Sequence, residues 1–313
     1  MTFNRILFPI DFSEHSQKLN AEVEWLAARF NSTVTLMHVF EIPSSWYGAA
    51  DAPMLTGDDI VAFANADKQR LQNYSIHIPE SRIERVSLEG GAAWHIANWT
   101  KEHSTDLVVM GTHGFGALRR MLLGSVAMKV LHDVDCPVWM QATKPAEPGQ
   151  FGAINHIVCS IELTNETLPL LRFAKQLAAT FGATVRLLHV VPQQEVLEYK
   201  HFDVDFHQRI SNMAADEIAR RQQEAGTSFP LSITSGHIAQ DAADLAVDQK
   251  ADLILIGRGK AQGVFGSLRT NAADIIRQAP CPVLSYSMDW LANEFGTAPA
   301  AGGSAALPVS TLA

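Results

Sequence analysis

The chain carries one sequence pattern twice, and this repeat limits its fold more than any other feature. Residues 6–11 (ILFPID) resemble residues 157–162 (IVCSIE), which lie 151 positions later. At the same spacing, residues 36–39 (LMHV) match residues 187–190 (LLHV). A chain of 313 residues has room for about two domains. The repeat therefore predicts two copies of one domain in tandem.

The match continues at smaller spacings towards the end of each copy. Residues 105–111 match residues 251–257 at a spacing of 146, and Cys136 matches Cys281 at a spacing of 145. The second copy is therefore six residues shorter than the first. Five of these residues are lost between the second and fourth predicted strands, and one is lost within a glycine-rich loop.

Composition predicts the domain boundaries. The residues between the two copies are rich in proline, glycine and polar side chains, which is typical of a linker. The end of the chain is dominated by small residues that cannot build a core. We expect a first domain over 1–143, a linker over 144–153, a second domain over 154–288 and a flexible tail over 289–313.

Each copy alternates strand patterns with helix patterns. In the first copy, short apolar or β-branched runs lie at about 5–10, 33–40, 82–88, 106–111 and 137–141. Strands that alternate with helices favour an α/β fold with a parallel sheet covered on both faces. We expect two doubly wound, Rossmann-like domains with five-stranded parallel sheets, in the order 2-1-3-4-5 or 3-2-1-4-5.

Charge and cysteine content exclude several classes of function. The formal charge of −9 argues against nucleic acid as a partner, because nucleic-acid binding usually rests on a basic surface. Three cysteines without CxxC spacing indicate neither a disulfide framework nor a metal site. We find no signal-peptide pattern and no apolar run long enough to span a bilayer, so we expect a cytoplasmic protein without membrane contact.

A glycine-rich loop after the fourth predicted strand carries the chemistry. Gly111 and Gly114 follow the strand, and Gly124 and Ser125 precede a helical pattern. Glycine lets backbone N–H groups approach an anion closely, and a helix N-terminus favours negative charge. Asp11, at the end of the first predicted strand, can accept hydrogen bonds from a ribose or a base. The pattern predicts a mononucleotide site.

This spacing, G-x2-G-x9-G-S, together with PID at 9–11 and CPV at 136–138, resembles the ATP-binding branch of the universal stress protein family. The resemblance covers both copies. It implies the adenine nucleotide α-hydrolase-like fold, with strand order 3-2-1-4-5, and ATP as the ligand, with or without Mg²⁺. The ligand-binding residues that it implies are Pro9, Ile10, Asp11, Val39, Met110, Gly111, Gly114, Gly124, Ser125 and Val126.

The resemblance also implies that two domains pair through their last strands. Residues 138–140 would then pair with residues 283–285 within this one chain, which makes the chain its own pseudo-dimer. The sequence leaves open whether two such chains form a homodimer.

The second copy departs from the ligand pattern at nearly every position. Its replacements are Ser160 for Pro9, Glu162 for Asp11, Lys260 for Gly114, Arg269 for Gly124 and Thr270 for Ser125. A shifted alignment on Gly266 and Ser267 would leave the loop much too short. Because Arg269 would place a side chain where a phosphate should lie, we expect the second copy to bind nucleotide poorly or not at all.

Simpler interpretations stand beside these. Asp11 could cap the first helix or close a turn, and the glycines could form an ordinary connection. His113, Arg119 and Arg120 could be solvated loop residues.

We consider three alternative functions. The first is an ATP-binding stress-response regulatory module, which we favour. The second is slow ATP hydrolysis or autophosphorylation involving Asp11, His113 or Ser125. The third is a nucleotide-free interaction scaffold. We assign no catalytic residue and no metal ligand.

Overall fold

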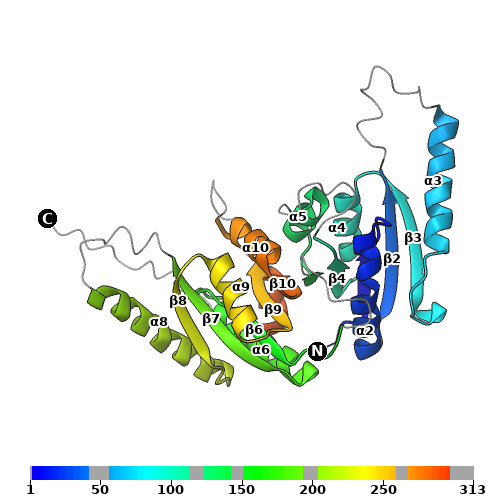
Figure 1. Cartoon of the computed structure of the whole chain (residues 1–313). Helices are drawn as coiled ribbons and strands as arrows, with labels where there is room; N and C mark the ends of the chain where they lie inside the picture. The colour runs from blue at the N-terminus through cyan, green and yellow to red at the C-terminus, as the bar shows by residue number, and fades with distance from the viewer. Residues whose placement is uncertain are drawn as a thin grey trace, which may run out of the picture.

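The chain is described by a computed structural model. It covers residues 2–41, 56–112, 123–141, 151–192, 204–258 and 267–296, without the side chains of 204–207 and 267–270. Figure 1 shows two α/β domains joined near the middle of the chain. Within the described residues, no helix combines the length and the apolar character needed to cross a membrane.

The first domain contains strands β1 to β5 and helices α1 to α5. Its strands are β1 (Arg5–Pro9), β2 (Thr33–Phe40), β3 (Ile83–Glu89), β4 (Leu107–Met110) and β5 (Val138–Met140). Its helices are α1 (Glu14–Lys18), α2 (Asn20–Phe30), α3 (Gly57–Gln72), α4 (Ala92–Glu102) and α5 (Ser125–Asp133), with a short 3₁₀ turn η2 (Glu80–Arg82). The strands lie where the sequence predicts them.

The second domain repeats this arrangement. Its strands are β6 (His156–Ser160), β7 (Thr184–Pro192), β8 (Leu231–Gly236), β9 (Leu253–Arg258) and β10 (Val283–Ser287). Its helices are α6 (Thr167–Phe181), α8 (Val204–Ala225), α9 (Ile238–Asp248), α10 (Ser267–Gln278) and α11 (Met288–Phe295).

The ten strands of the described residues form one sheet, in the order β3-β2-β1-β4-β5-β10-β9-β6-β7-β8. Each half has the order 3-2-1-4-5, which confirms the family expectation and selects between the two orders left open by the strand pattern. The halves meet through antiparallel β5 and β10, where Trp139 lies opposite Leu284 and Val138 opposite Ser285. The predicted pairing of 138–140 with 283–285 is confirmed.

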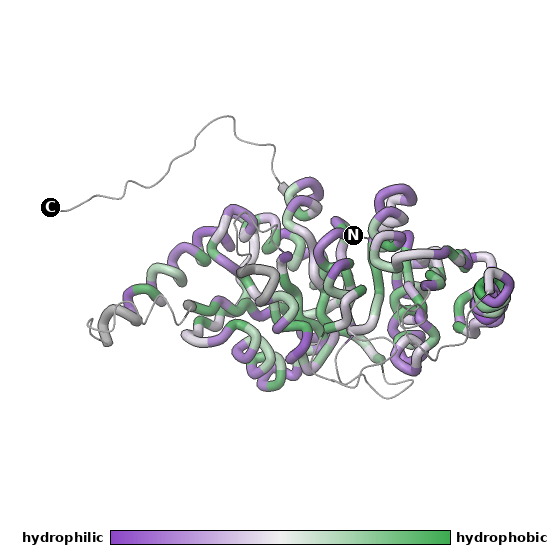
Figure 2. The backbone as a smooth tube through the Cα atoms, turned by 90° about the horizontal axis from the view of Figure 1, so that it is seen from above, coloured by the Kyte–Doolittle hydropathy of each residue, from purple (hydrophilic) through white to green (hydrophobic). Residues whose placement is uncertain are grey.

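Helices cover both faces of the sheet, and each face has its own hydrophobic core. One core packs α2, α6 and α11 against the sheet, and the other packs α4, α5, α9 and α10. Both cores continue across the domain junction, where Trp139 is fully buried. Figure 2 shows hydrophobic stretches mainly along the strands and hydrophilic stretches along the outer helices.

The sequence repeat is also a repeat of hydrogen bonds. The Asp106 carboxylate accepts from the backbone N–H of Arg5 at 2.9 Å, and the Asp252 carboxylate accepts from that of His156 at 3.0 Å. Each bond ties the start of a domain's first strand to the residue before its fourth strand. The two copies therefore share this hydrogen bond as well as the sequence pattern.

The predicted tail from residue 289 is wrong for its first part, because 288–295 form α11. Leu291 is fully buried, the Phe295 ring lies 5.3 Å from that of Phe173, and Arg172 donates to the Phe295 carbonyl at 3.0 Å. The small residues that suggested a tail begin only after this apolar helix face. Residues 297–313 lie outside the described residues, as do 142–150 of the linker region.

Candidate functional site

The candidate site lies where β1 and β4 end side by side. These strands are parallel neighbours, with Ile6 opposite Leu107 and Leu7 opposite Val108. From β1 the chain winds outward to β2 and β3, whereas β4 leads the other way to β5. Ligands of doubly wound sheets bind at such a reversal, beyond the carboxyl ends of the strands. The crevice is thus bounded by the residues that follow Pro9 and Met110.

The end of β1 is held firmly in place. The Ile10 N–H donates to the Met37 carbonyl at 2.7 Å, and Nδ1 of His38 lies 2.7 Å from the Ile10 carbonyl oxygen. Nε2 of His38 lies 3.2 Å from the Asp67 carboxylate. The Ile10 side chain is buried in the core, so Ile10 holds the end of β1 in place and offers no exposed side chain for ligand contact.

Asp11 closes the turn that begins α1. Its Oδ1 accepts from the backbone N–H of Ser13 at 3.0 Å, from the Ser13 hydroxyl at 2.7 Å and from the Ser16 hydroxyl. Ser13 in turn caps α1 by accepting from the Ser16 N–H at 3.2 Å. This is the simpler role considered for Asp11. Its other oxygen, Oδ2, receives no hydrogen bond from the described residues.

Phe12 is a site residue that the sequence did not indicate. Its φ of 61° lies in the left-handed region, which is strained for a bulky side chain. The ring packs on that of His38 at 4.4 Å, and the Arg70 guanidinium lies 4.4 Å above it. These contacts with His38 and Arg70 hold the strained turn next to Asp11. No local sequence signal marks a phenylalanine with positive φ.

The second half of the site is the N-terminus of α5. Gly124 precedes the helix, and its N–H donates to the Thr112 carbonyl at 2.9 Å. This hydrogen bond joins the residues on either side of the glycine-rich loop. No described side chain caps this helix. The N–H groups of Ser125 and Val126 belong to the first turn, where helices lack internal partners. Ser125 is exposed and Val126 half-buried.

The remaining predicted residues divide into two groups. Val39, Met110 and Gly111 lie along or just after β2 and β4, where Met110 is buried and the other two are half-buried. Gly114 lies outside the described residues, together with His113, Arg119 and Arg120. The structure thus gathers the described candidates at one edge of the sheet, from β1, β2, β4 and α5.

The second domain differs at the equivalent helix. Buried Ala272 and Ile275 of α10 occupy the core positions of Ala127 and Val130 in α5, which keeps the spacing of 145. α10 nevertheless begins at Ser267, so Arg269 is its third residue and lies in the first turn of the helix. The free N–H groups begin three residues earlier, a shift of about 4.5 Å along the axis at 1.5 Å per residue.

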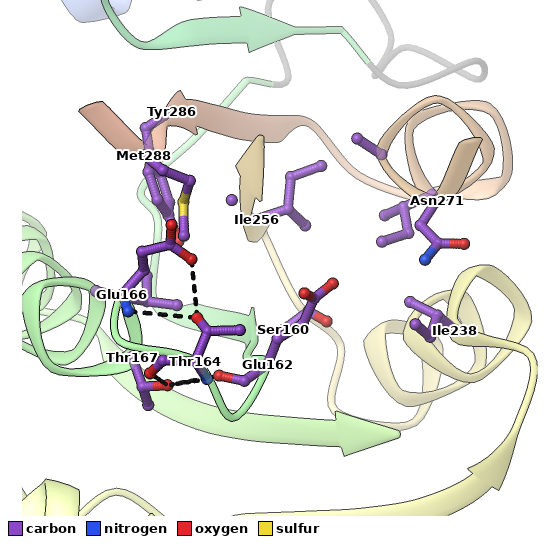
Figure 3. A pocket seen from close by; sticks show the side chains of 14 residues that line it. Ser160, Glu162, Thr164, Glu166, Thr167, Ile238, Ile256, Asn271, Tyr286 and Met288 are labelled. Carbon is purple, nitrogen blue, oxygen red and sulfur yellow. Dashed lines mark hydrogen bonds between the residues drawn. The ribbon is translucent and has the colours of Figure 1, made fainter. Parts of the chain in front are cut away.

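The crevice of the second domain encloses a cavity of about 130 Å³ (Figure 3). Glu162, at the position of Asp11, and Glu166 both line it. Burial, followed by the nearby charge of Glu166, raises the pKa of Glu162. Two carboxyl groups in a partly buried space oppose the binding of another anion.

A larger hollow of about 1060 Å³ lies between the two domains, against α4, α5 and α10. Ser125 and Val126 line its edge, but Pro9 and Asp11 do not. Because Pro9 and Asp11 do not line this hollow, its large volume is no reason to equate it with the crevice at the ends of β1 and β4.

Comparisons with known proteins agree with the fold. The profile of the universal stress protein family matches residues 2–141 and 153–286. Universal stress protein A homolog 1 of Coxiella burnetii is 30% identical over 146 residues, which cover 45% of this chain and 99% of that protein. The crystal structure of a universal stress protein from Archaeoglobus fulgidus superposes with a TM-score of 0.63 at 18% identity, over 91% of this chain and 97% of that chain.

A universal stress protein solved in complex with cAMP is 20% identical and covers 46% of this chain and 100% of its own. Its TM-score of 0.30 is too low to transfer its ligand to this chain.

Proposed function

The chain belongs to the universal stress protein family, and we propose that it is an ATP-binding regulatory member holding one nucleotide in its first domain. One observation carries the proposal. Thr112 is two residues past the end of β4, and its hydrogen bond from Gly124 holds the start of α5, which no described side chain caps, next to that strand end. β1 is the parallel neighbour of β4. Phosphate-binding amides and a ribose-binding carboxylate then belong to one crevice.

Each group has a proposed role. The N–H groups of Ser125 and Val126, with the Ser125 hydroxyl, would bind phosphate oxygens at the positive end of the helix dipole. Oδ2 of Asp11 would accept from a ribose hydroxyl. Pro9 and Val39 would contact the base. Gly114 joins this set through the family resemblance alone.

We assign the nucleotide a regulatory role because α5 connects the proposed site to the other domain. Its N-terminus would meet the phosphates, and at its other end the carbonyls of Leu131 and of the C-cap residue Val134 accept hydrogen bonds from Arg258 of the second domain. Nucleotide that favours one position of α5 would shift the balance between domain arrangements. The three buried cysteines carry free thiols, and we expect the protein in the reducing cytoplasm.

Isothermal titration calorimetry with ATP tests the proposal directly. We expect one site per chain, lost in Gly124→Arg. Gly57→Arg is the matched control, because it places the same side chain at the start of α3, where a Cβ meets open space. Two equal sites would contradict the assignment of the second domain. Absence of binding in the native protein would favour the scaffold function.

A single-turnover assay with radiolabelled ATP separates binding from hydrolysis. Stably bound ATP is the expected result for a regulatory module. Release of phosphate that disappears in Gly124→Arg but persists in Gly57→Arg would make the protein an ATPase instead.

A further inference from the structure

The cavity of the second domain has an unusual combination of walls. It is lined from β6, β9, β10, α6, α9 and α10 and lies at the carboxyl ends of β6 and β9, the counterparts of β1 and β4 (Figure 3). One side is polar, with Glu162, Glu166 and Tyr286. The other side carries Ile238 and Ile256, with Asn271 beside Ile238 as a polar group (Figure 3). An occupant must therefore satisfy both a charged and an aliphatic environment.

The Tyr286 hydroxyl has no hydrogen-bond partner among the described residues, although the side chain is fully buried. A comparison with the first domain gives the reason. Gln141, the counterpart of Tyr286, donates to buried Glu22 at 3.2 Å, but the counterpart of Glu22 in the second domain is Phe173, which offers no acceptor. The Phe173 and Tyr286 rings pack with centroids 5.4 Å apart. Tyr286 thus lines the cavity, and its buried hydroxyl is satisfied by none of the described residues, which is costly.

Glu162 is the second group without a partner. Its carboxylate makes no hydrogen bond or ion pair with the described residues, while Glu166 accepts from the Thr164 hydroxyl at 2.8 Å. No lysine, arginine or histidine is found among the described residues that line the cavity. Among the described residues that line the cavity, the charged groups are therefore Glu162 and Glu166, and their negative charge favours a cation.

The chemistry of the walls favours an organic cation over a metal ion. In the described part of the chain, no cluster of three or more His, Cys, Asp or Glu side chains could hold a metal. The apolar side chains opposite the carboxylates suit a short hydrocarbon instead.

We propose that this cavity binds a small primary ammonium compound, with its N–H donors on Glu162 and the Tyr286 hydroxyl and its aliphatic part against Ile238 and Ile256. An ammonium has three donors and no acceptor, so the tyrosine hydroxyl accepts from it. The proposal is independent of nucleotide binding in the first domain.

Titration with n-butylammonium, followed by NMR of ¹³C-methyl methionine, tests it in the full chain. Met288 lines the cavity, and its signal is assigned by its loss in Met288→Leu. We expect a saturable shift of this signal. 1-Butanol, which has the same number of heavy atoms but no charge, should bind at least about tenfold more weakly, since a hydrogen bond to a charged group is worth that factor. Equal binding of both compounds, or no saturable shift, overturns the proposal.

Two substitutions locate the binding groups. Glu162→Gln should weaken n-butylammonium about tenfold and Tyr286→Phe about threefold. Glu102→Gln, a change at the exposed end of α4, is the matched control and should bind like the native chain. Far-UV circular dichroism and the melting temperature establish that each variant is folded. A folded Glu162→Gln variant with native affinity refutes the proposed site.

Discussion

The guanidinium of Arg258 donates a hydrogen bond of 2.7 Å to the carbonyl oxygen of Cys136, which lies in the other domain. It also donates to the carbonyls of Leu131 at 2.7 Å and Val134 at 3.1 Å. The last carbonyls of a helix have no internal partner and attract positive charge. Buried Arg258 thus caps α5 from across the domain junction and is the clearest polar link between the two halves.

Removing this cap should destabilise the protein strongly. We expect Arg258→Ala to lower the free energy of unfolding by about 3 kcal/mol, because it leaves buried carbonyls without donors. Arg220→Ala is the control: Arg220 pairs with Glu217 on the exposed side of α8, and its loss should have no measurable effect. Urea denaturation followed by circular dichroism measures both. Equal effects of the two substitutions would show that the cap contributes nothing.

Buried Glu22 should make stability depend on pH. It accepts from the Trp139 indole N–H at 2.6 Å and from Gln141 at 3.2 Å. Burial, only partly offset by these bonds, raises the pKa of Glu22 from 4.5 to about 7. Between these values the folded state holds a proton that the unfolded state has released. The stabilisation is therefore complete below pH 4.5 and is lost as the pH rises to about 7.

Glu22→Gln should remove this dependence. The native chain should lose about 3 kcal/mol between these pH values relative to the variant, since one pKa unit corresponds to about 1.4 kcal/mol. The glutamine side chain keeps an acceptor for Trp139, so the packing around it is preserved. Urea denaturation of both proteins at several pH values gives the difference curve. A flat curve would mean that Glu22 stays ionised in the fold.

The strands were predictable because their signals are local and repeated, whereas the strand pattern left two orders open and the family resemblance indicated the order that the structure has. The strand over 33–40, for example, is an apolar run that the structure reproduces as β2. The polar contacts that complete the site were not predictable, because their partners are distant in sequence. Arg258 caps carbonyls more than 120 residues away, and Gly124 meets Thr112 across a loop. The start of α10 likewise depends on backbone geometry that the repeat did not preserve.

Asp11 has a structural and a proposed ligand-binding role, and two substitutions separate them. Asp11→Asn keeps an oxygen for Ser13 and Ser16 but replaces the other carboxylate oxygen with a donor. We expect it to weaken ATP binding about tenfold with a stability change below about 1 kcal/mol. Ser16→Ala removes the two hydrogen bonds between the Ser16 hydroxyl and Asp11 and should cost about 1 kcal/mol without changing affinity. Calorimetry and urea denaturation provide the two measurements. If both variants lose the same affinity, Asp11 acts only through the turn.

The buried cysteines offer a probe of the domain junction. Burial raises the pKa of Cys136 and of Cys281 to about 12 and that of Cys159 well above its usual range. Because the thiolate is the reactive form, native protein at pH 8 should react slowly with N-ethylmaleimide, and unfolded protein should react rapidly at all three positions.

Arg258→Ala should change this pattern at one position. Loss of the Arg258 charge disfavours the Cys136 thiolate, which alone would slow labelling. Loss of the hydrogen bond to the Cys136 carbonyl frees the backbone beside it, which exposes the thiol. Since a buried thiol reacts only after opening, we expect exposure to dominate and Cys136 to react faster than Cys159. Peptide mass spectrometry measures each rate. A uniform rise at all three cysteines would indicate global unfolding and contradict a local cap.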